Sequence, residues 1–313
     1  MIQPSSQSAR VPPACSRRQC RPRTPRSMQL ETTATLLDGR ALARELTADL
    51  TRRAERLREA GNAPRLVVEM VGEDESSLAY ARSLLKLGAK IGIEVDLEQM
   101  SADATEERLK RRLRVLGEDP SIHGVLLHQP LPRHLRIERI APSISEQKDV
   151  DATNPANQGR LAYGHDPLFV PATPQAVMLL LEASPAWPVR GKRAVVVGRS
   201  VVVGLPVSLL LLAADATVTT CHIATTDLAR HTREAEVLVV AAGVPGLITA
   251  QMVSPGVTVV DVGTTVVKSV LKGDVAYEEV ARIAAAITPV PGGVGPVTNV
   301  ALMRNVIAAA ERT

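Results

Sequence analysis

Aromatic side chains are scarce in this sequence, since its 313 residues include one Phe, one Trp and three Tyr. Proteins that bind single-stranded nucleic acid stack the bases on aromatic rings, so this scarcity argues against a nucleic-acid partner. Hydrophobic residues still make up 45% of the chain, which excludes disorder for most of its length. The cores must therefore be filled by Val, Leu, Ile and Ala.

Cysteine is equally rare, with Cys15 and Cys20 near the N-terminus and only Cys221 in the body. This number argues against a disulfide framework and a cysteine-based metal site. The histidines show no spacing typical of metal ligands, so no metal is predicted. No apolar run reaches the ~18 to 20 residues of a membrane span, and no apolar secretory signal begins the chain. We therefore expect a cytoplasmic protein with no membrane partner.

Acidic residues are absent from residues 1–27, which carry six arginines and are rich in Pro and Ser. Without these arginines the rest of the chain has a slightly negative formal charge, so the net +4 belongs to this segment. We predict a disordered basic tail here. Its origin stays open between an extension from an upstream start codon, a true disordered tail and an Arg-rich transit peptide.

Hydrophobic periodicity in the body alternates between helix and strand. Leu42 to Leu57 recur at helical spacing, and a strand-like run at 65–71 follows. The further elements expected in the first half are helices at 76–90 and 104–116 and strands at 93–97 and 124–127. Such alternation is typical of a parallel α/β sheet.

The second half repeats this pattern after a loop-rich stretch at 141–175. A helix is predicted at 175–182, and strands are predicted at 194–198, 217–221, 237–241 and 257–262. This is typical of a Rossmann-like, doubly wound parallel sheet. The predicted division is a tail at 1–27, a first α/β domain at 28–155 completed by a helix at 299–313, and a nucleotide domain at 156–298.

A glycine turn follows the first strand of the second half. Residues 191–206 combine a hydrophobic run, the turn Gly198-Arg199-Ser200 and a helix that opens near Gly204. Glycine lets the backbone approach a ligand, and the free N–H groups of a helix start favour a phosphate. The spacing departs from G-x-G-x-x-G, so a turn without a ligand stays an alternative. If a nucleotide binds, Arg199 favours NADP by pairing with its 2′-phosphate.

Two other segments lie where an α/β protein places its ligands. The loop at 287–298 holds three prolines and three glycines, which suits wrapping a flat ligand, although a plain connector is the alternative. His128 ends the strand at 124–127, and Lys148-Asp-Val-Asp151 follows from the same layer. Ligands bind beyond the carboxyl ends of such strands. Taken alone, His128 is more typical of a structural histidine.

The order of these motifs resembles that of methylenetetrahydrofolate dehydrogenase/cyclohydrolase, the FolD family. The similarity covers about residues 36–310 and includes Cys221-His222, Asp261-Val-Gly263 and Gly273-Asp-Val275. Members of this family oxidise 5,10-methylenetetrahydrofolate with NADP, and most then hydrolyse the product to 10-formyltetrahydrofolate. The resemblance implies a tetrahydrofolate substrate bound in a cleft between two domains, a homodimer, and a place in the one-carbon metabolism that supplies purine biosynthesis.

The resemblance also implies roles for individual residues. Tyr80 would stack on the folate and Asp151 would hold the pterin ring, with His128 as the third catalytic candidate. The other implied substrate-binding residues are Pro291, Gly292 and Gly293. The implied nucleotide-binding residues are Thr173, Gly198, Arg199, Ser200 and Thr264.

Two departures from the family pattern concern its hydrolase step. The family places a lysine four residues after the tyrosine, on the same helix face, where this sequence has Leu84. Lys86 comes six residues after Tyr80 and therefore points about 120° away from it around the helix. The glutamine that partners the lysine is His128 here, and Gln129 should face the opposite side of the strand. We therefore expect impaired cyclohydrolase activity. Hydride transfer mainly needs alignment of substrate and cofactor, so we expect dehydrogenase activity to be retained.

Smaller departures are Ala152, Ile223 and Thr265, of which Ile223 leaves NAD open as the cofactor. Two alternative functions remain open. One is a catalytically degenerate paralogue that binds folate or nucleotide as a sensor or partner subunit. The other is an unrelated nucleotide-dependent dehydrogenase, which the proline-glycine loop disfavours.

Overall fold

A computed structural model of the chain describes residues 34–72, 75–164 and 167–313. The predictions for residues 1–27 therefore lie outside the described residues. The strands are β1 (Thr35–Leu36), β2 (Arg65–Val71), β3 (Glu94–Met100), β4 (Gly124–Leu127), β5 (Arg193–Val197), β6 (Thr217–Cys221), β7 (Val237–Val240), β8 (Thr258–Asp261), β9 (Thr265–Val267), β10 (Val270–Lys272) and β11 (Ala286–Ile287).

Helices alternate with these strands through most of the chain. The α-helices are α1 (Gly39–Glu59), α2 (Glu75–Ile91), α3 (Glu106–Glu118), α4 (Ile137–Ile140), α5 (Pro155–Ala162), α6 (Ala172–Glu182), α7 (Gly204–Ala213), α8 (Leu228–Arg233), α9 (Tyr277–Val280) and α10 (Val294–Ala310). The 3₁₀ helices are η1 (Ala141–Ser143) and η2 (Ala250–Met252).

The strands form two parallel sheets and one hairpin. A three-stranded sheet has the order β3-β2-β4, and a six-stranded sheet has the order β1-β11-β8-β7-β5-β6. Strands β9 and β10 pair with each other in an antiparallel hairpin. Parallel sheets need helices on both faces, and here each sheet has them. The mixed α/β class and the doubly wound sheet predicted from periodicity are thus confirmed.

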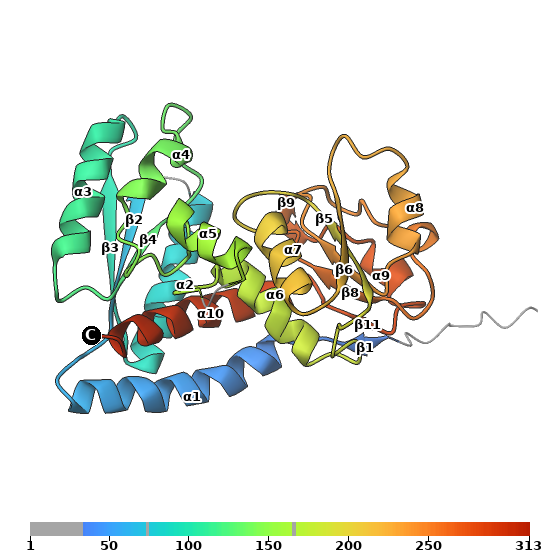
Figure 1. Cartoon of the computed structure of the whole chain (residues 1–313), viewed down its shortest axis with the longest axis horizontal. Coiled ribbons are helices and arrows are strands. Elements are labelled where there is room, and N and C mark those ends of the chain that lie inside the picture. The colour runs from blue at the N-terminus through green and yellow to red at the C-terminus, as the bar shows by residue number, and fades with distance from the viewer. Residues whose placement is uncertain (1–33, 73–74, 165–166) are drawn as a thin grey trace, which may run out of the picture. The chain divides into compact units, whose positions relative to one another are not determined.

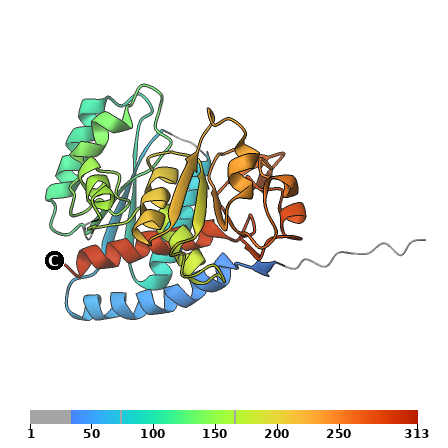
Figure 2. The same cartoon turned by 45° about the vertical axis from the view of Figure 1, so that its right-hand side comes forward.

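Alternating side chains of β2 explain how the smaller sheet is covered. Leu66, Val68 and Met70 pack with α1, α2 and α10, whereas Val67 and Val71 pack with α3. The two sets point to opposite faces because successive strand residues alternate. In Figure 1, α1 and α10 run side by side beneath this sheet, and Figure 2 shows the same pair after a 45° turn.

Helix α1 begins where its sequence supplies a cap. The Asp38 carboxylate accepts hydrogen bonds from the N–H groups of Arg40 and Ala41 at 2.9 and 3.1 Å. Such a cap satisfies N–H groups that have no partner inside the helix. The helix then buries Leu50 and Ala54 on its core side.

Helix α10 corrects one prediction and connects both halves of the fold. It begins at Val294, five residues before the predicted Asn299, so the proline-glycine loop is shorter than expected. Its first turns pack Val294 and Val297 against the larger sheet, and Val300 onward packs against the smaller sheet. The segment that follows the loop is apolar on nearly all sides, and such a helix is buried from its start.

Several short helices and strands were not predicted from the sequence. The stretch at 141–175 was expected to be mainly loop, yet it contains η1, α5 and the first turn of α6. Strands β1 and β11 are only two residues long, and neither gives a periodic signal. They join the sheet because β11 pairs with β8 and β1 pairs with β11. No helix in the described ranges is both long and apolar enough to span a membrane.

Candidate active site

A cavity of about 470 Å³ opens beyond the carboxyl ends of β8 and β11. Of the predicted site residues, it is lined by Tyr80 from α2, Thr173 from α6, Thr264 after β8, and Pro291, Gly292 and Gly293 between β11 and α10. These residues come from both halves of the sequence. The cavity therefore has the position that open α/β sheets give to their ligands.

Tyr80, His128 and Asp151 form a group at one wall of this cavity. The rings of Tyr80 and His128 are stacked, with centroids 5.0 Å apart and an interplanar angle of 21°. The backbone N–H of His128 donates to the carbonyl of Glu69 on β2 at 2.9 Å, which fixes where β4 ends. His128 and Asp151 are half-buried, and neither lines the cavity.

Burial changes the acid–base behaviour of this group. It raises the pKa of the Asp151 carboxyl to about 7, although a hydrogen bond from the N–H of Ala172 at 2.8 Å opposes the shift. Burial also raises the pKa of Tyr80, and the nearby Asp151 charge adds to that effect. A carboxyl that titrates near neutrality can both accept and donate hydrogen bonds at physiological pH.

The glycine turn after β5 is tightly packed at both of its glycines. Gly198 has φ of +125°, and a Cβ there would lie 2.2 Å from the carbonyl oxygen of Ala241. A Cβ on Gly204 would lie 2.1 Å from the carbonyl oxygen of Gly198. Only glycine fits at both positions, so the turn stays tight against the start of α7.

The start of α7 offers few free backbone donors, because the N–H of Leu205 donates to the carbonyl of Ser200 at 3.0 Å and Pro206 has no N–H. No side chain caps this helix, and no acidic residue lies in its first turn. The Ser200 hydroxyl accepts from the N–H of Val203 at 3.2 Å, which holds the turn closed. Arg199 is exposed beside it. An exposed guanidinium beside a tight glycine turn suits a phosphate. This turn does not line the main cavity, but Val203 lines it and connects the two.

Asp261 stabilises the cavity floor at the end of β8. Its carboxylate accepts from the N–H groups of Gly263, Asp274 and Val275 at 2.9 to 3.0 Å. Burial raises the pKa of Asp261 to about 6, against the effect of these hydrogen bonds. The predicted motifs at 261–263 and 273–275 are therefore two sides of one structural cluster.

The departures from the family pattern can be located in the structure. Leu84 is 0% exposed and packs in the core with Ala81 and Leu302. Lys86 is exposed on the outside of α2. Gln129 lines a different cavity with Leu135 and Ile137, as expected for the opposite side of the strand. Ile223 is fully exposed after β6.

Sequence reasoning missed two polar residues that line the cavity. Arg40, in the first turn of α1, lies against the proline-glycine loop, where a Cβ on Gly292 would be 3.3 Å from its Nε. Asn299 of α10 donates to the Ser83 hydroxyl at 3.1 Å. Neither has a sequence signal, because both lie far along the chain from the residues they approach.

Fold and cavity together define a two-domain α/β enzyme of the nucleotide-dependent kind, with a glycine turn beside a cavity that both domains line. Residues 37–151 match the family profile "Tetrahydrofolate dehydrogenase/cyclohydrolase, catalytic domain". Residues 171–313 match "Tetrahydrofolate dehydrogenase/cyclohydrolase, NAD(P)-binding domain". The chain belongs to the tetrahydrofolate dehydrogenase/cyclohydrolase family, which confirms the resemblance seen in its motifs.

Individual relatives match most of the chain in sequence and in structure. The bifunctional protein FolD of Cupriavidus necator is 46% identical over 280 residues, which are 89% of this chain and 98% of that protein. The crystal structure of the bifunctional FolD enzyme from Campylobacter jejuni has a TM-score of 0.87 at 40% identity, covering 89% and 99% of the two chains. The Trypanosoma brucei FolD structure, complexed with NADP cofactor and inhibitor, has a TM-score of 0.85 at 38% identity, covering 89% and 98%.

Proposed function

We propose that the protein oxidises 5,10-methylenetetrahydrofolate to 5,10-methenyltetrahydrofolate with NADP, in one-carbon folate metabolism. The observation that carries this proposal is the cavity lined by Tyr80 and the proline-glycine loop, which Val203 connects to the glycine turn before α7. The NADP complex of the Trypanosoma brucei relative supports the choice of cofactor. The exposed Arg199 supplies the charge that would favour a 2′-phosphate over a free ribose hydroxyl.

The residues of the cavity account for binding and alignment. Tyr80 offers a ring face, and the glycines at 292 and 293 leave room for a flat pterin opposite it. We keep the proposal that Asp151 holds the pterin, and because its carboxylate does not line the cavity, a local rearrangement would be needed for the oxygen that Ala172 does not use to reach the ring. Of the described residues lining the cavity, Arg40 is the only cationic one, so we assign it to the glutamate carboxylates of the folate tail.

The nicotinamide cofactor would supply the hydride acceptor, and the protein supplies alignment. Bringing two reactants into contact in a fixed orientation can lower a barrier by roughly 7–11 kcal/mol. No proton transfer from a side chain is needed for the hydride step itself. The dehydrogenase half-reaction is therefore compatible with the absence of the family lysine.

We further propose that the cyclohydrolase half-reaction is impaired in this member. Attack of water on the methenyl carbon needs a group that can exchange a proton or polarise the water, which is typically worth 10² to 10⁴ in rate. At the lysine position the chain has the fully buried Leu84, and Lys86 is exposed on the outside of α2. His128 lies at the glutamine position, stacked on Tyr80.

One assay separates this proposal from the alternative of a catalytically degenerate paralogue that only binds folate or nucleotide. Purified protein is mixed with 5,10-methylenetetrahydrofolate and either NADP or NAD, and methenyl-folate formation is followed by absorbance. Turnover that is faster with NADP supports the proposal. Binding of both ligands without turnover would favour a sensor or partner subunit.

We also propose the division of the chain into a first domain at 28–155, completed by the end of α10, and a nucleotide domain at 156–298. The packing of α10 against both sheets supports it. We propose a cytoplasmic homodimer. The exposed Val266 and Val270 of the β9–β10 hairpin support association, and light scattering on the purified protein tests it.

A further inference from the structure

Asn299 lines the folate cavity, the one of about 470 Å³ beyond β8 and β11, and the proposed function gives it no role. It lies in the second turn of α10 and is half-buried. Among the described residues that line this cavity, it is the only one whose side chain ends in an amide. An amide offers two N–H donors and one acceptor oxygen, so the partners of each atom decide what it can bind.

The orientation of this amide follows from a chain of two hydrogen bonds. The Ser83 hydroxyl donates to the backbone carbonyl of Tyr80 at 2.6 Å, so its only proton is already used. The same hydroxyl can then only accept, and it accepts from Asn299 Nδ2 at 3.1 Å. A flipped amide would place its oxygen against the Ser83 oxygen with no proton between them. The nitrogen of Asn299 is therefore held by Ser83, and Oδ1 is turned away from it.

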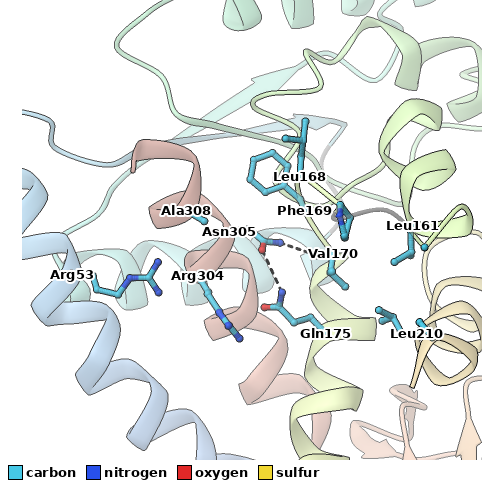
Figure 3. Close-up of a pocket in the computed structure, with 13 residues that line it drawn as sticks. Arg53, Leu161, Leu168, Phe169, Val170, Gln175, Leu210, Arg304, Asn305 and Ala308 are labelled. Atoms are coloured by element: carbon cyan, nitrogen blue, oxygen red, sulfur yellow. Dashed lines mark hydrogen bonds between the residues drawn. The ribbon is translucent and has the colours of Figure 1, made fainter. Parts of the chain in front are cut away.

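Another asparagine on α10 shows how a structural amide is satisfied. Asn305 is buried, and its Nδ2 donates to the carbonyls of Val150 and Val170 at 2.7 and 2.8 Å. Its Oδ1 accepts from Gln175 Nε2 at 3.4 Å (Figure 3). Both ends of this amide are thus used inside the protein, and none of it remains for a ligand.

The oxygen of Asn299 has no such partner. No hydrogen bond to Asn299 Oδ1 is found in the part of the chain that the structure describes. The oxygen is also not closed off from solvent, in contrast to the buried and unpartnered Gln175 Oε1. It is therefore an acceptor that a ligand in the cavity can reach.

The same two hydrogen bonds place the amide of Asn299 beside the proposed position of the pterin. They join Asn299 to the turn of α2 that carries Tyr80, on whose ring the folate is proposed to stack. Stacking uses the faces of a ring and leaves the N–H groups at its edge in need of acceptors. The carboxylate of Asp261, which also lines the cavity, already accepts from three backbone N–H groups.

We propose that Asn299 is a further substrate-binding residue, whose Oδ1 accepts a hydrogen bond from an N–H group of the pterin. Ser83 is the positioning residue that holds the amide in the orientation this contact needs. The inference rests on the proposed function, because that function places the folate in this cavity. It adds a polar contact from α10 to the stacking contact that α2 provides.

The test compares Asn299→Leu with Asn299→Asp in the full-length protein. Leucine has the same branched shape and no acceptor, so we expect the KM for 5,10-methylenetetrahydrofolate to rise about fivefold. Tetrahydrofolate binding, measured by calorimetry, should weaken by a similar factor. Aspartate keeps an acceptor oxygen for the pterin and can accept from Ser83 once that hydroxyl rotates, so its values should stay close to those of the unmodified protein. NADP affinity should be unchanged in both variants.

Ser83→Ala tests the positioning role. It leaves Asn299 in place but frees its amide to rotate, so we expect the KM for the folate to rise, by less than in Asn299→Leu. An unchanged KM would show that Ser83 does not orient the amide. This variant also decides the test if Asn299→Leu fails to fold, because its substitution only removes a hydroxyl.

Three results would overturn the assignment of Asn299. The first is an unchanged KM and tetrahydrofolate affinity in Asn299→Leu. The second is an equal loss in Asn299→Leu and Asn299→Asp, which would mean that the amide acts only by holding α2 in place. The third is a loss of NADP affinity as large as the loss of folate affinity, which would mean that the substitution disturbs the whole cavity.

Failure of the proposed function would look different. The unmodified protein would then bind tetrahydrofolate without oxidising 5,10-methylenetetrahydrofolate, and calorimetry on the same variants would still decide the role of Asn299. An unmodified protein that oxidises the substrate, with an Asn299→Leu variant that binds it equally well, would refute the inference alone. An unmodified protein that binds no tetrahydrofolate would refute both.

Discussion

Restoring the missing lysine should restore hydrolysis of methenyl-folate. Leu84 lies one turn after Tyr80 on α2, and Tyr80 lines the cavity. A lysine at position 84 can keep its aliphatic stem in the space of the buried leucine and extend its ammonium towards the substrate beside Tyr80. Burial there would lower the pKa of the new amine, so that it can act as an acid or a base near neutral pH.

The expected gain follows from the role of such a group. Positioned proton transfer contributes typically 10² to 10⁴ in rate, which corresponds to about 3 to 5 kcal/mol of barrier. We expect Leu84→Lys combined with His128→Gln to hydrolyse methenyl-folate at least 100-fold faster than the unmodified protein. The melting temperature should fall, because the core loses a fully buried leucine.

The assay measures both half-reactions in the same preparation. The decay of methenyl-folate absorbance, corrected for the buffer rate, gives the hydrolase, and its formation with NADP gives the dehydrogenase. Leu84→Met is the matched control, since it makes a similar change in shape without a titratable group. A dehydrogenase rate close to that of the unmodified protein shows that the variant is folded.

Two results would refute this reasoning. The first is an unmodified protein that hydrolyses methenyl-folate well above the buffer rate, in which case His128→Ala tests whether the histidine replaces the lysine. The second is a folded, dehydrogenase-active double variant that hydrolyses no faster than Leu84→Met. Either result would mean that position 84 does not control the second half-reaction.

Three further predictions follow from the site. Arg199→Ala should weaken NADP binding about tenfold and NAD binding little, and equal losses in calorimetry would show that Arg199 does not contact the 2′-phosphate. Gly198→Ala should abolish nucleotide binding, because its Cβ would lie 2.2 Å from the Ala241 oxygen, and a variant with normal affinity would contradict this geometry. The raised pKa of Asp151, about 7, means that the folded protein holds this proton more tightly than the unfolded chain, so its contribution to stability falls as pH rises from about 4 to 7. Urea unfolding should therefore show Asp151→Asn gaining stability relative to the unmodified protein over that range, and a constant difference would contradict the shift.

The sequence by itself determined the elements that depend on local periodicity and on glycine. The spacing of Leu109, Leu113 and Leu116 predicts α3, and the run at 65–71 predicts β2 with the bounds that the structure has. Gly198 and Gly204 could be recognised from the pattern of strand, glycine turn and helix, although the contact that excludes a Cβ on Gly198, with the Ala241 oxygen after β7, is tertiary. The substitution at Leu84 was also visible, because it needs only a position on a helix and a family motif.

Only the tertiary structure decided which distant residues meet. Arg40 reaches the folate cavity, and Gln175 pairs with Asn305, through contacts that no local pattern encodes. The two-residue strands β1 and β11 exist because neighbouring strands supply their hydrogen bonds. Burial, and with it the raised pKa of Asp151, is likewise a property of packing, since desolvation depends on every segment that covers the group and not on its own neighbours in the chain.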